Sequence, residues 1–508
     1  MANPARTHAD VDGAPSPSSL AEKHDVSSLE KGAHDFLNSG QQSVVSTLEY
    51  TAEEERRVLR KVDWALLPGL TFLYLLSFLD RSNIGNAKLL GLMKDIGLAD
   101  QPEAYNTSLA LYFLGYVLFE IPANIVLKKF SPRIWLPSLT IAWGVTATLQ
   151  ALIKDEAGFY AARFFMGVSE AGLFPGVIFV FSMYYKRKER TLRCSLFFGG
   201  AALAGSFGGI LAWGLGHING GGLKPWGWLF AIEGMFTVLV GISAYFWVPG
   251  FPRQAKFLSE REHAILIARL QADGDSGDEE PFSWQGVWDA LKDPFVNAYG
   301  WLFHCFAMTL YSLSLFLPTI IAQLGFANWR SQLMTVPVYF MALVGILFFV
   351  WFSHKINQRG TAIAVGGAIA IIGYIILSTT HTPGARYAGT FFAVIGIYAS
   401  NALLLAWPSE NVSPQTKRAV ASGMQIFIGD VGAIAGVLIY RPSLASNFYR
   451  TPHGVAILYT GCGILLALGL SFAMHRANKS GNVRRAARRE GKGEEAKGDR
   501  ARGYLFQI

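Results

Sequence analysis

The chain has 508 residues, of which 51% are hydrophobic and only 16% are charged, and its mean hydropathy is +0.30. A soluble protein of this size would not easily stay in solution with that balance, so the composition indicates an integral membrane protein. The net charge of +8 does not indicate nucleic-acid binding, because the basic residues gather in short loops and a tail where membrane topology explains them.

Apolar stretches long enough to cross a bilayer recur along the chain, since a hydrocarbon core of roughly 30 Å needs about 20 helical residues. A transmembrane barrel would require short strands of alternating polarity, and a stretch such as "VAILYTGCGILLALGLSFAM" does not alternate. Twelve spans are predicted, at 62–82, 105–128, 133–153, 158–182, 194–216, 226–248, 298–322, 333–353, 361–380, 387–408, 419–440 and 454–475.

The spans fall into two groups of six, separated by a long polar stretch. The expected parts are a disordered cytoplasmic tail at 1–60, an N-terminal half at 61–248, a cytoplasmic central loop at 249–297, a C-terminal half at 298–475 and a basic cytoplasmic tail at 476–508. Two six-helix halves joined by a long loop are the layout of the major facilitator fold, whose site lies near the bilayer midplane between the halves. The sequence therefore predicts an all-α membrane protein of that fold.

Basic residues predict the orientation, because Lys and Arg in short loops are retained on the cytoplasmic side. They cluster before the first span, in "KRKERTLR" after the fourth and in "RRAARR" after the twelfth, whereas the alternate loops are poorer in them. Both termini are therefore expected in the cytoplasm.

Several ionisable side chains interrupt the spans, at a cost of at least a few kcal/mol each unless they face a cavity or a partner. The N-terminal half carries most of them, which a purely structural scaffold would not require. They are Asp80, Arg81, Glu120, Arg163, Glu170, Glu233, His304 and Asp430.

Arg163 and Glu170 are separated by about 700° of helical turn, so they share one face of their helix. If Asp80 and Arg81 face the same cavity, the four residues form one cluster. Arg81 would hold a carboxylate in a bidentate fork, and Glu170 would bind a proton when its partners change. The alternative is that Asp80 and Arg81 form an interfacial ion pair and Arg163 a structural tie.

Four segments carry a family resemblance: "FLDRSNIGNAKL", "YVLFEIPANIVLKKFSPRIWLP", "ARFFMGVSEAGLFPGVIF" and "WGWLFAIEG". They resemble the fungal allantoate and nicotinate permease group, within the anion:cation symporters of the major facilitator superfamily. The resemblance runs from about residue 63 to residue 475. It implies proton-coupled import of a small organic anion, such as nicotinate or another vitamin or nitrogen source, at the plasma membrane.

The resemblance also implies roles for single residues. Arg81 would bind the anion, Glu170 would couple protons, Asp80 would be a second proton carrier, and Arg163 would be a charge partner near the substrate. Asp430 stands in "IFIGDVGAIAG", where relatives tend to have Asn, at a position that resembles a substrate contact. An acid there could move a proton site, disfavour dianions or pair with a basic group.

Asn401 completes the candidate substrate-binding residues. No metal site or cofactor is expected, and the partners are a small organic anion, protons and the lipid bilayer, with a monomer as the functional unit. The sequence contains no nucleotide-binding loop or nucleophile elbow, so we expect no enzyme. Two alternatives remain open: an exporter of a fungal secondary metabolite with the same fold, and a nutrient receptor.

Overall fold

The computed structural model describes residues 49–218, 220–272, 283–326, 328–413, 415–489 and 506. The chain divides into a short unit, Met1–Glu55, and a large unit, Arg56–Ile508. Within the described residues, the one β-type pairing is an isolated bridge between Gly220 and Leu223, and all other regular structure is helical. The predicted all-α class is confirmed.

The first long helix, α2 (Ala52–Leu89), begins inside the stretch 1–60 that was predicted to be disordered. Thr51 and Glu54 form a capping box: the Glu54 N–H donates to Thr51 Oγ1 at 3.2 Å, and the Thr51 N–H donates to the Glu54 carboxylate at 3.0 Å. Acidic residues in the first turn also favour the positive end of the helix dipole. The prediction was wrong for residues 52–60, and residues 1–48 lie outside the described part.

Helices of the N-terminal half follow the predicted spans, with one interruption. The predicted span 158–182 is divided between Glu170 and Leu173, and Pro175 has no N–H to donate to the carbonyl of Ala171 at this point. The elements are α3 (Leu92–Asp95), α4 (Glu103–Phe130), α5 (Pro132–Leu149), η1 (Gln150–Leu152), α6 (Glu156–Glu170), α7 (Leu173–Tyr184), α8 (Arg187–Leu215) and α9 (Pro225–Trp247).

Six long helices form the C-terminal half, and the last of them runs into the predicted basic tail at 476–508 as far as Arg489. They are α12 (Pro294–Ala322), α13 (Asn328–Ile356), α14 (Arg359–Thr379), α15 (Pro383–Asn411), α16 (Gln415–Ile439) and α17 (Arg450–Arg489). A short helix, η4 (Pro442–Asn447), precedes α17.

Ten helical stretches among the described residues are long and apolar enough to cross a membrane, with α6 and α7 together forming one of them. The predicted spans 105–128 and 133–153 correspond to α4 and α5, which are helical but fall outside these ten. Each of the twelve predicted spans corresponds to helical structure, and one of them, 158–182, is divided into α6 and α7.

The central loop at 249–297 contains η2 (Pro252–Gln254), α10 (Glu260–Ala272) and α11 (Trp284–Leu291), and residues 273–282 lie outside the described part. Ser259 and Glu262 cap α10 reciprocally, as their spacing predicts. Lys61 Nζ lies 2.5 Å from Glu262 Oε1, and its hydrogen bond, with those from Ser259, lowers the pKa of Glu262. Helix α10 is thereby attached to the N-terminal half, whereas α11 packs on α16.

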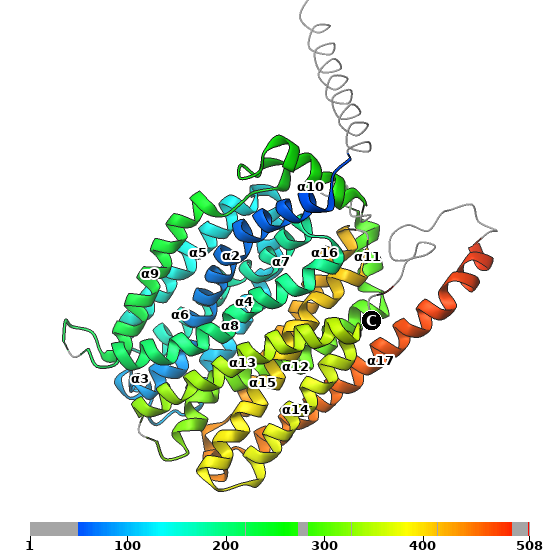
Figure 1. Ribbon diagram of the computed structural model, residues 1–508. Helices are drawn as coiled ribbons and strands as arrows, with labels where there is room; N and C mark the ends of the chain where they lie inside the picture. Colours follow the sequence, from blue (N-terminus) through cyan, green and yellow to red (C-terminus); the bar gives the residue numbers. More distant parts are fainter. Residues whose placement is uncertain are drawn as a thin grey trace, which may run out of the picture. The chain divides into compact units, whose positions relative to one another are not determined.

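Figure 1 shows α2–α9 gathered in one group and α12–α17 in another, with α16 passing close to α4. Each group packs internally, for example α5 on α9 and α14 on α15, and the groups meet where α8 contacts α13 and α15 and where α4 contacts α16. The end of the bundle that carries α10 is named the α10 end below, and the opposite end, which carries α3, is named the α3 end.

Candidate functional site

The centre of the N-terminal half contains a buried ion pair between α2 and α6. Arg81 Nη2 lies 2.5 Å from Glu170 Oε1, which also accepts from the hydroxyl of Ser77, one turn before Arg81. The hydroxyl of Tyr112 donates to Glu170 Oε2 at 2.7 Å. Both carboxylate oxygens are therefore satisfied, as a buried charge requires.

Arg81 also reaches the other half of the molecule. Its Nη1 donates to the hydroxyl of Tyr311 on α12 at 2.9 Å, and the rings of Tyr112, Tyr116 and Tyr311 all lie within cation–π range of its guanidinium. The Arg81 guanidinium thus links the Glu170 carboxylate in the first half to the Tyr311 phenol in the second. Loss of the bond to Glu170 would therefore alter a contact between the halves.

Asp80 does not join this cluster. Consecutive helix residues point about 100° apart, so the side chain next to Arg81 faces α5 and α9 instead. There its Oδ2 accepts from Trp143 Nε1 at 3.2 Å and from Thr237 Oγ1 at 2.9 Å. The expectation of a single cluster of Asp80, Arg81, Arg163 and Glu170 was therefore wrong for Asp80, which forms no ion pair with the described basic residues.

Arg163 shares the face of α6 with Glu170, but the two do not form an ion pair. Its guanidinium lies 5.1 Å from the ring of Tyr112, which also lies 5.2 Å from the Arg81 guanidinium, and its Nη1 donates to Gln150 Oε1 at 3.4 Å. Nε and Nη2 of Arg163 are buried and have no hydrogen-bond partner among the described residues. Arg163 therefore contributes charge to the site through Tyr112 rather than by direct contact with Glu170.

A small cavity lies beside Arg81, at the contact between the halves. Asp430 on α16 faces it from the side opposite the N-terminal helices. Its volume is about 10 Å³, enough for about one water molecule, so a carboxylate substrate does not fit without an opening movement. The other lining residues are mainly aromatic: Tyr74, Tyr116, Phe174, Phe198, Phe303 and Tyr311, with Leu310, Leu405 and Ile426.

Asn401 is buried on α15 and is not among the residues that line this cavity. Its Nδ2 donates to the backbone carbonyls of Ile397 and Phe306, at 2.8 and 3.4 Å. The structure therefore gives Asn401 a helix-packing position in this conformation, whereas Arg81 and Asp430 share the cavity.

Sequence reasoning missed the residues that complete the site. Tyr112 and Tyr116 are one turn apart on α4, and Ser77 precedes Arg81 by one turn on α2, so helical spacing from the ionisable residues could have indicated Ser77. Tyr311 offered no such signal, because it lies in the other half. Within the described residues, no three His, Cys, Asp or Glu side chains gather to hold a metal ion.

Comparison with known proteins identifies the family of this fold. The model of the Major Facilitator Superfamily matches residues 70–437. The chain belongs to the Major Facilitator Superfamily. It is accordingly a multi-pass membrane transporter of a small molecule, and not an enzyme.

Relatives and solved structures support the family assignment over most of the chain. The MFS-type transporter cnsO of Penicillium expansum is 36% identical over 85% of this chain and 85% of its own. The major facilitator-type transporter hxnP of Emericella nidulans is 30% identical over 80% of this chain and 85% of its own. The xylose transporter XylE from E. coli, in a partially occluded inward-open conformation, shares the fold with a TM-score of 0.60 and 15% identity, covering 78% of this chain and 96% of that one.

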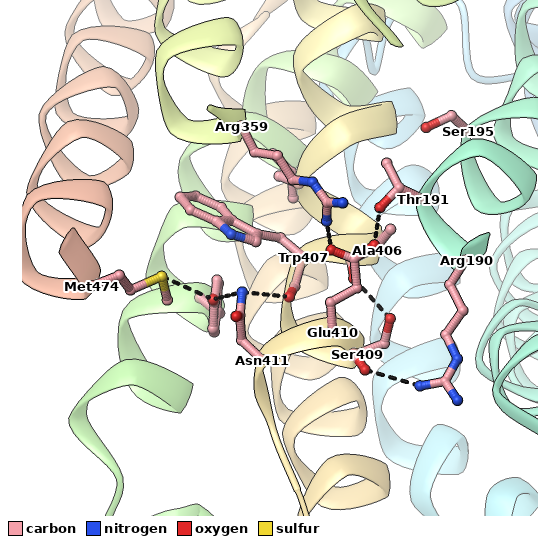
Figure 2. A network of polar contacts seen from close by, with 12 residues as sticks. Arg190, Thr191, Ser195, Arg359, Ala406, Trp407, Ser409, Glu410, Asn411 and Met474 are labelled. Carbon is pink, nitrogen blue, oxygen red and sulfur yellow. Dashed lines mark hydrogen bonds and ion pairs between the residues drawn. The ribbon is translucent and has the colours of Figure 1, made fainter. Parts of the chain in front are cut away.

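In this transporter, contacts between the halves close the α10 end. Figure 2 shows Arg190, Thr191 and Ser195 of α8 facing the end of α15. Arg190 Nη1 donates to the Ser409 carbonyl at 3.1 Å, and the hydroxyl of Thr191 donates to Glu410, which also pairs with Arg359 of α14. The bonds of Arg190 and Thr191 join the two halves at the α10 end.

The α3 end is closed as well. Asn106 Nδ2 on α4 donates to two carbonyls at the end of α16, those of Val437 at 2.6 Å and Tyr440 at 3.1 Å. Asn106 matches a glycosylation motif, "NTS", but its burial at this contact gives it a structural position. With the halves bonded to each other at both ends and a cavity of only about 10 Å³ beside Arg81, the transporter is in an occluded state.

The buried centre contains more acidic groups than basic ones. Among the described residues near the cavity and its neighbouring helices, the buried guanidinium groups are those of Arg81 and Arg163. The buried carboxyl groups are those of Asp80, Glu120, Glu170, Glu233 and Asp430.

Proposed function

We propose that the protein is a proton-coupled symporter of the allantoate and nicotinate permease group, which imports a small organic anion across the plasma membrane. Both termini would lie in the cytoplasm, which makes the α10 end cytoplasmic. The observation that carries the proposal is the Arg81–Glu170 ion pair. Arg81 lines the cavity and could bind an anion, but its guanidinium is bonded to the Glu170 carboxylate of the protein itself.

This pair explains how a proton and an anion would be coupled. Glu170 as a carboxylate competes with the substrate carboxylate for the Arg81 guanidinium. Protonation of Glu170 removes that competitor, and the Arg81 fork is then free to bind the anion. By linkage, a bound anion raises the affinity of Glu170 for the proton to the same extent. Each partner therefore favours the binding of the other, as symport requires.

The lining of the cavity supports a nicotinate-like carboxylate as the substrate. Tyr74, Phe174 and Phe198 present aromatic rings near Arg81, so a planar aromatic ring could stack while its carboxylate meets the guanidinium. Movement of the two halves about this site would then expose it alternately to each side, through rupture of the contacts at the α3 end or at the α10 end.

Uptake measurements test this function. Radiolabelled nicotinate is offered at pH 4.5 and 7.5 to yeast cells that lack their own carrier and express the wild type, Arg81→Ala or Glu170→Gln. We expect acid-stimulated uptake in the wild type and its loss in both variants. Ser82→Ala and Ser169→Ala are matched controls, because among the described residues these neighbouring hydroxyls donate to carbonyls of their own helices. Uptake that survives Arg81→Ala at normal surface expression would show that the pair is structural.

An exporter of a metabolite is the second candidate, because the same aromatic lining also suits an apolar compound without a carboxylate. The same cells separate the two functions when they are preloaded with label. An exporter lowers retention of the label at acidic external pH, whereas an importer raises its accumulation. No uptake of nicotinate by surface-expressed wild type would exclude this substrate and require a panel of other carboxylates.

A further inference from the structure

Lys88, in the last turn of α2, has surroundings that repeat those of Arg81. The two residues are seven apart in sequence, so they lie on one face of the helix and about 10 Å apart along it, with Lys88 nearer the α3 end. The Lys88 ammonium lies 4.0 Å from the ring centroid of Tyr105 on α4 and 5.8 Å from that of Phe316 on α12. Both distances are within cation–π range.

The same three helices supply the rings around both cations. The Arg81 guanidinium lies 5.2 Å from the ring of Tyr112 and 5.5 Å from that of Tyr311. Tyr105 is seven residues from Tyr112 on α4, which runs away from the α3 end while α2 runs towards it. The cation of α2, the tyrosine of α4 and the aromatic ring of α12 therefore recur two turns nearer the α3 end.

The two cations differ in their anionic partner. Arg81 is bonded to the Glu170 carboxylate, whereas no ion pair among the described residues includes Lys88. Asp95, an acid of the α3 end, lies 3.8 Å from the ammonium of Lys224 instead. Cation–π contacts stabilise the Lys88 ammonium without neutralising it, so the ammonium retains its attraction for an anion.

Lys88 also lies where the halves meet at the α3 end. The hydroxyl of Tyr105 donates to the Leu315 carbonyl at 3.5 Å, and the rings of Tyr105 and Phe316 meet edge to face at 5.7 Å. A Cβ at Gly85, one turn before Lys88, would lie 2.8 Å from the same carbonyl, so α2 and α12 approach closely here. Opening of the α3 end separates these helices and removes the Phe316 ring from the ammonium.

We propose that Lys88 is an anion-binding residue on the passage from the α3 end to the cavity, and that it binds the carboxylate of an organic anion before Arg81 does. In the open end, the carboxylate takes the place that the Phe316 ring occupies in the closed one. The inference deepens the proposed anion import, on which its direction rests. A lysine at the C-terminal end of a helix also complements the helix dipole, but that structural role would not select anions over cations in the passage.

The charge selectivity of the passage tests this role without any substrate. Leu310, which lines the cavity, is replaced by Cys in the full chain, and Cys194, Cys305 and Cys462 are replaced by Ser. The new thiol is labelled with anionic sulfonatoethyl methanethiosulfonate or cationic trimethylammonioethyl methanethiosulfonate. Each reagent is applied to intact yeast cells and, separately, to inside-out plasma-membrane vesicles. A change in how often an end opens alters both rates by the same factor, so it cancels in the ratio of the anionic to the cationic rate.

Unit charges about 4 Å apart in water interact strongly enough to change a rate roughly fivefold. For reagents that enter from the α3 end, we therefore expect Lys88→Gln to lower the anionic rate roughly fivefold and to raise the cationic rate. Lys88→Arg should keep the wild-type ratio, and so should Lys88→Gln when the reagents enter from the α10 end. Lys94→Gln is the matched control, because it removes an exposed cation from α3 at the same end.

An unchanged ratio in Lys88→Gln on both sides of the membrane would overturn the proposal, and so would an equal change of both rates. A fall of the ratio in Lys94→Gln as large as in Lys88→Gln would assign the selectivity to the general charge of this end and would also overturn it. Nicotinate uptake gives an independent readout, in which Lys88→Gln should act mainly by raising KM. If the wild type takes up no nicotinate, the proposed substrate is wrong, whereas the labelling ratio still decides the role of Lys88.

Discussion

Asn106 holds the α3 end closed through two hydrogen bonds, so its replacement tests the occluded state directly. In Asn106→Ala, the carbonyls of Val437 and Tyr440 lose their donor. While the end is closed they stay buried and unpaired, at about 1 to 3 kcal/mol each. Opening admits water, which satisfies them. Loss of the Asn106 donor therefore destabilises the closed state and leaves the open state unchanged.

Taking about 1 kcal/mol for each carbonyl, the closed end is destabilised by about 2 kcal/mol relative to the open one. Since 1.4 kcal/mol corresponds to a factor of ten, the fraction open at the α3 end rises roughly 30-fold. The assay places a cysteine at Leu310, which lines the cavity, in a background without the three native cysteines. A membrane-impermeant maleimide added outside intact cells should label it roughly 30-fold faster in Asn106→Ala.

Thr107→Ala is the matched control, because the Thr107 side chain is exposed on the same turn and its hydroxyl donates to the Glu103 carbonyl of its own helix. It should label at the wild-type rate. Equal acceleration in both variants would mean that α4 is loosened generally. Unchanged labelling in Asn106→Ala, with normal surface expression, would refute the conclusion that these bonds hold the end closed.

Three other predictions concern the site, the helix packing and the central loop. Tyr112→Phe removes a donor to the Glu170 carboxylate, worth about 1.5 to 3 kcal/mol to a charged acceptor; the carboxylate is then less stable relative to its protonated form, so we expect the acid stimulation of uptake to extend to higher pH than in the wild type. Gly167→Ala places a Cβ only 1.9 Å from the Tyr112 carbonyl and should lower thermal stability by about 1 to 3 kcal/mol, whereas Gly423→Ala, with no atom within 4 Å, should be tolerated. Glu262→Gln removes the pair with Lys61; because the pKa of Glu262 is lowered in the folded state, its contribution, below about 1 kcal/mol, is present above pH about 4.3 and is lost as the pH falls through the folded pKa. The unfolding temperatures of wild type and Glu262→Gln should therefore differ at pH 7, and the difference should shrink as the pH falls below about 4.3.

The helical class and the position of most helices could be predicted from the sequence, because apolar stretches of about 20 residues have one favourable conformation in a bilayer. The ends were less predictable. Helix α2 starts at Ala52 because Thr51 and Glu54 cap it, a local signal that was present in a stretch assigned to disorder by composition. The division of α6 from α7 lies beside Pro175, a local signal, whereas the close approach of Gly172 to α4 and α5 there is seen only in the tertiary structure.

The sequence by itself determined which side chains could do chemistry in this protein: acids and guanidinium groups at membrane depth are too costly to be there by chance. The tertiary structure alone decided their partners. Asp80 and Arg81 are neighbours in the chain, yet one faces Trp143 and the other faces Glu170, because helical geometry separates adjacent side chains and packing of distant helices selects each partner. The same packing brings Tyr311 and Asp430 of the second half to the cavity beside Arg81, a contact between residues whose separation in sequence carries no signal.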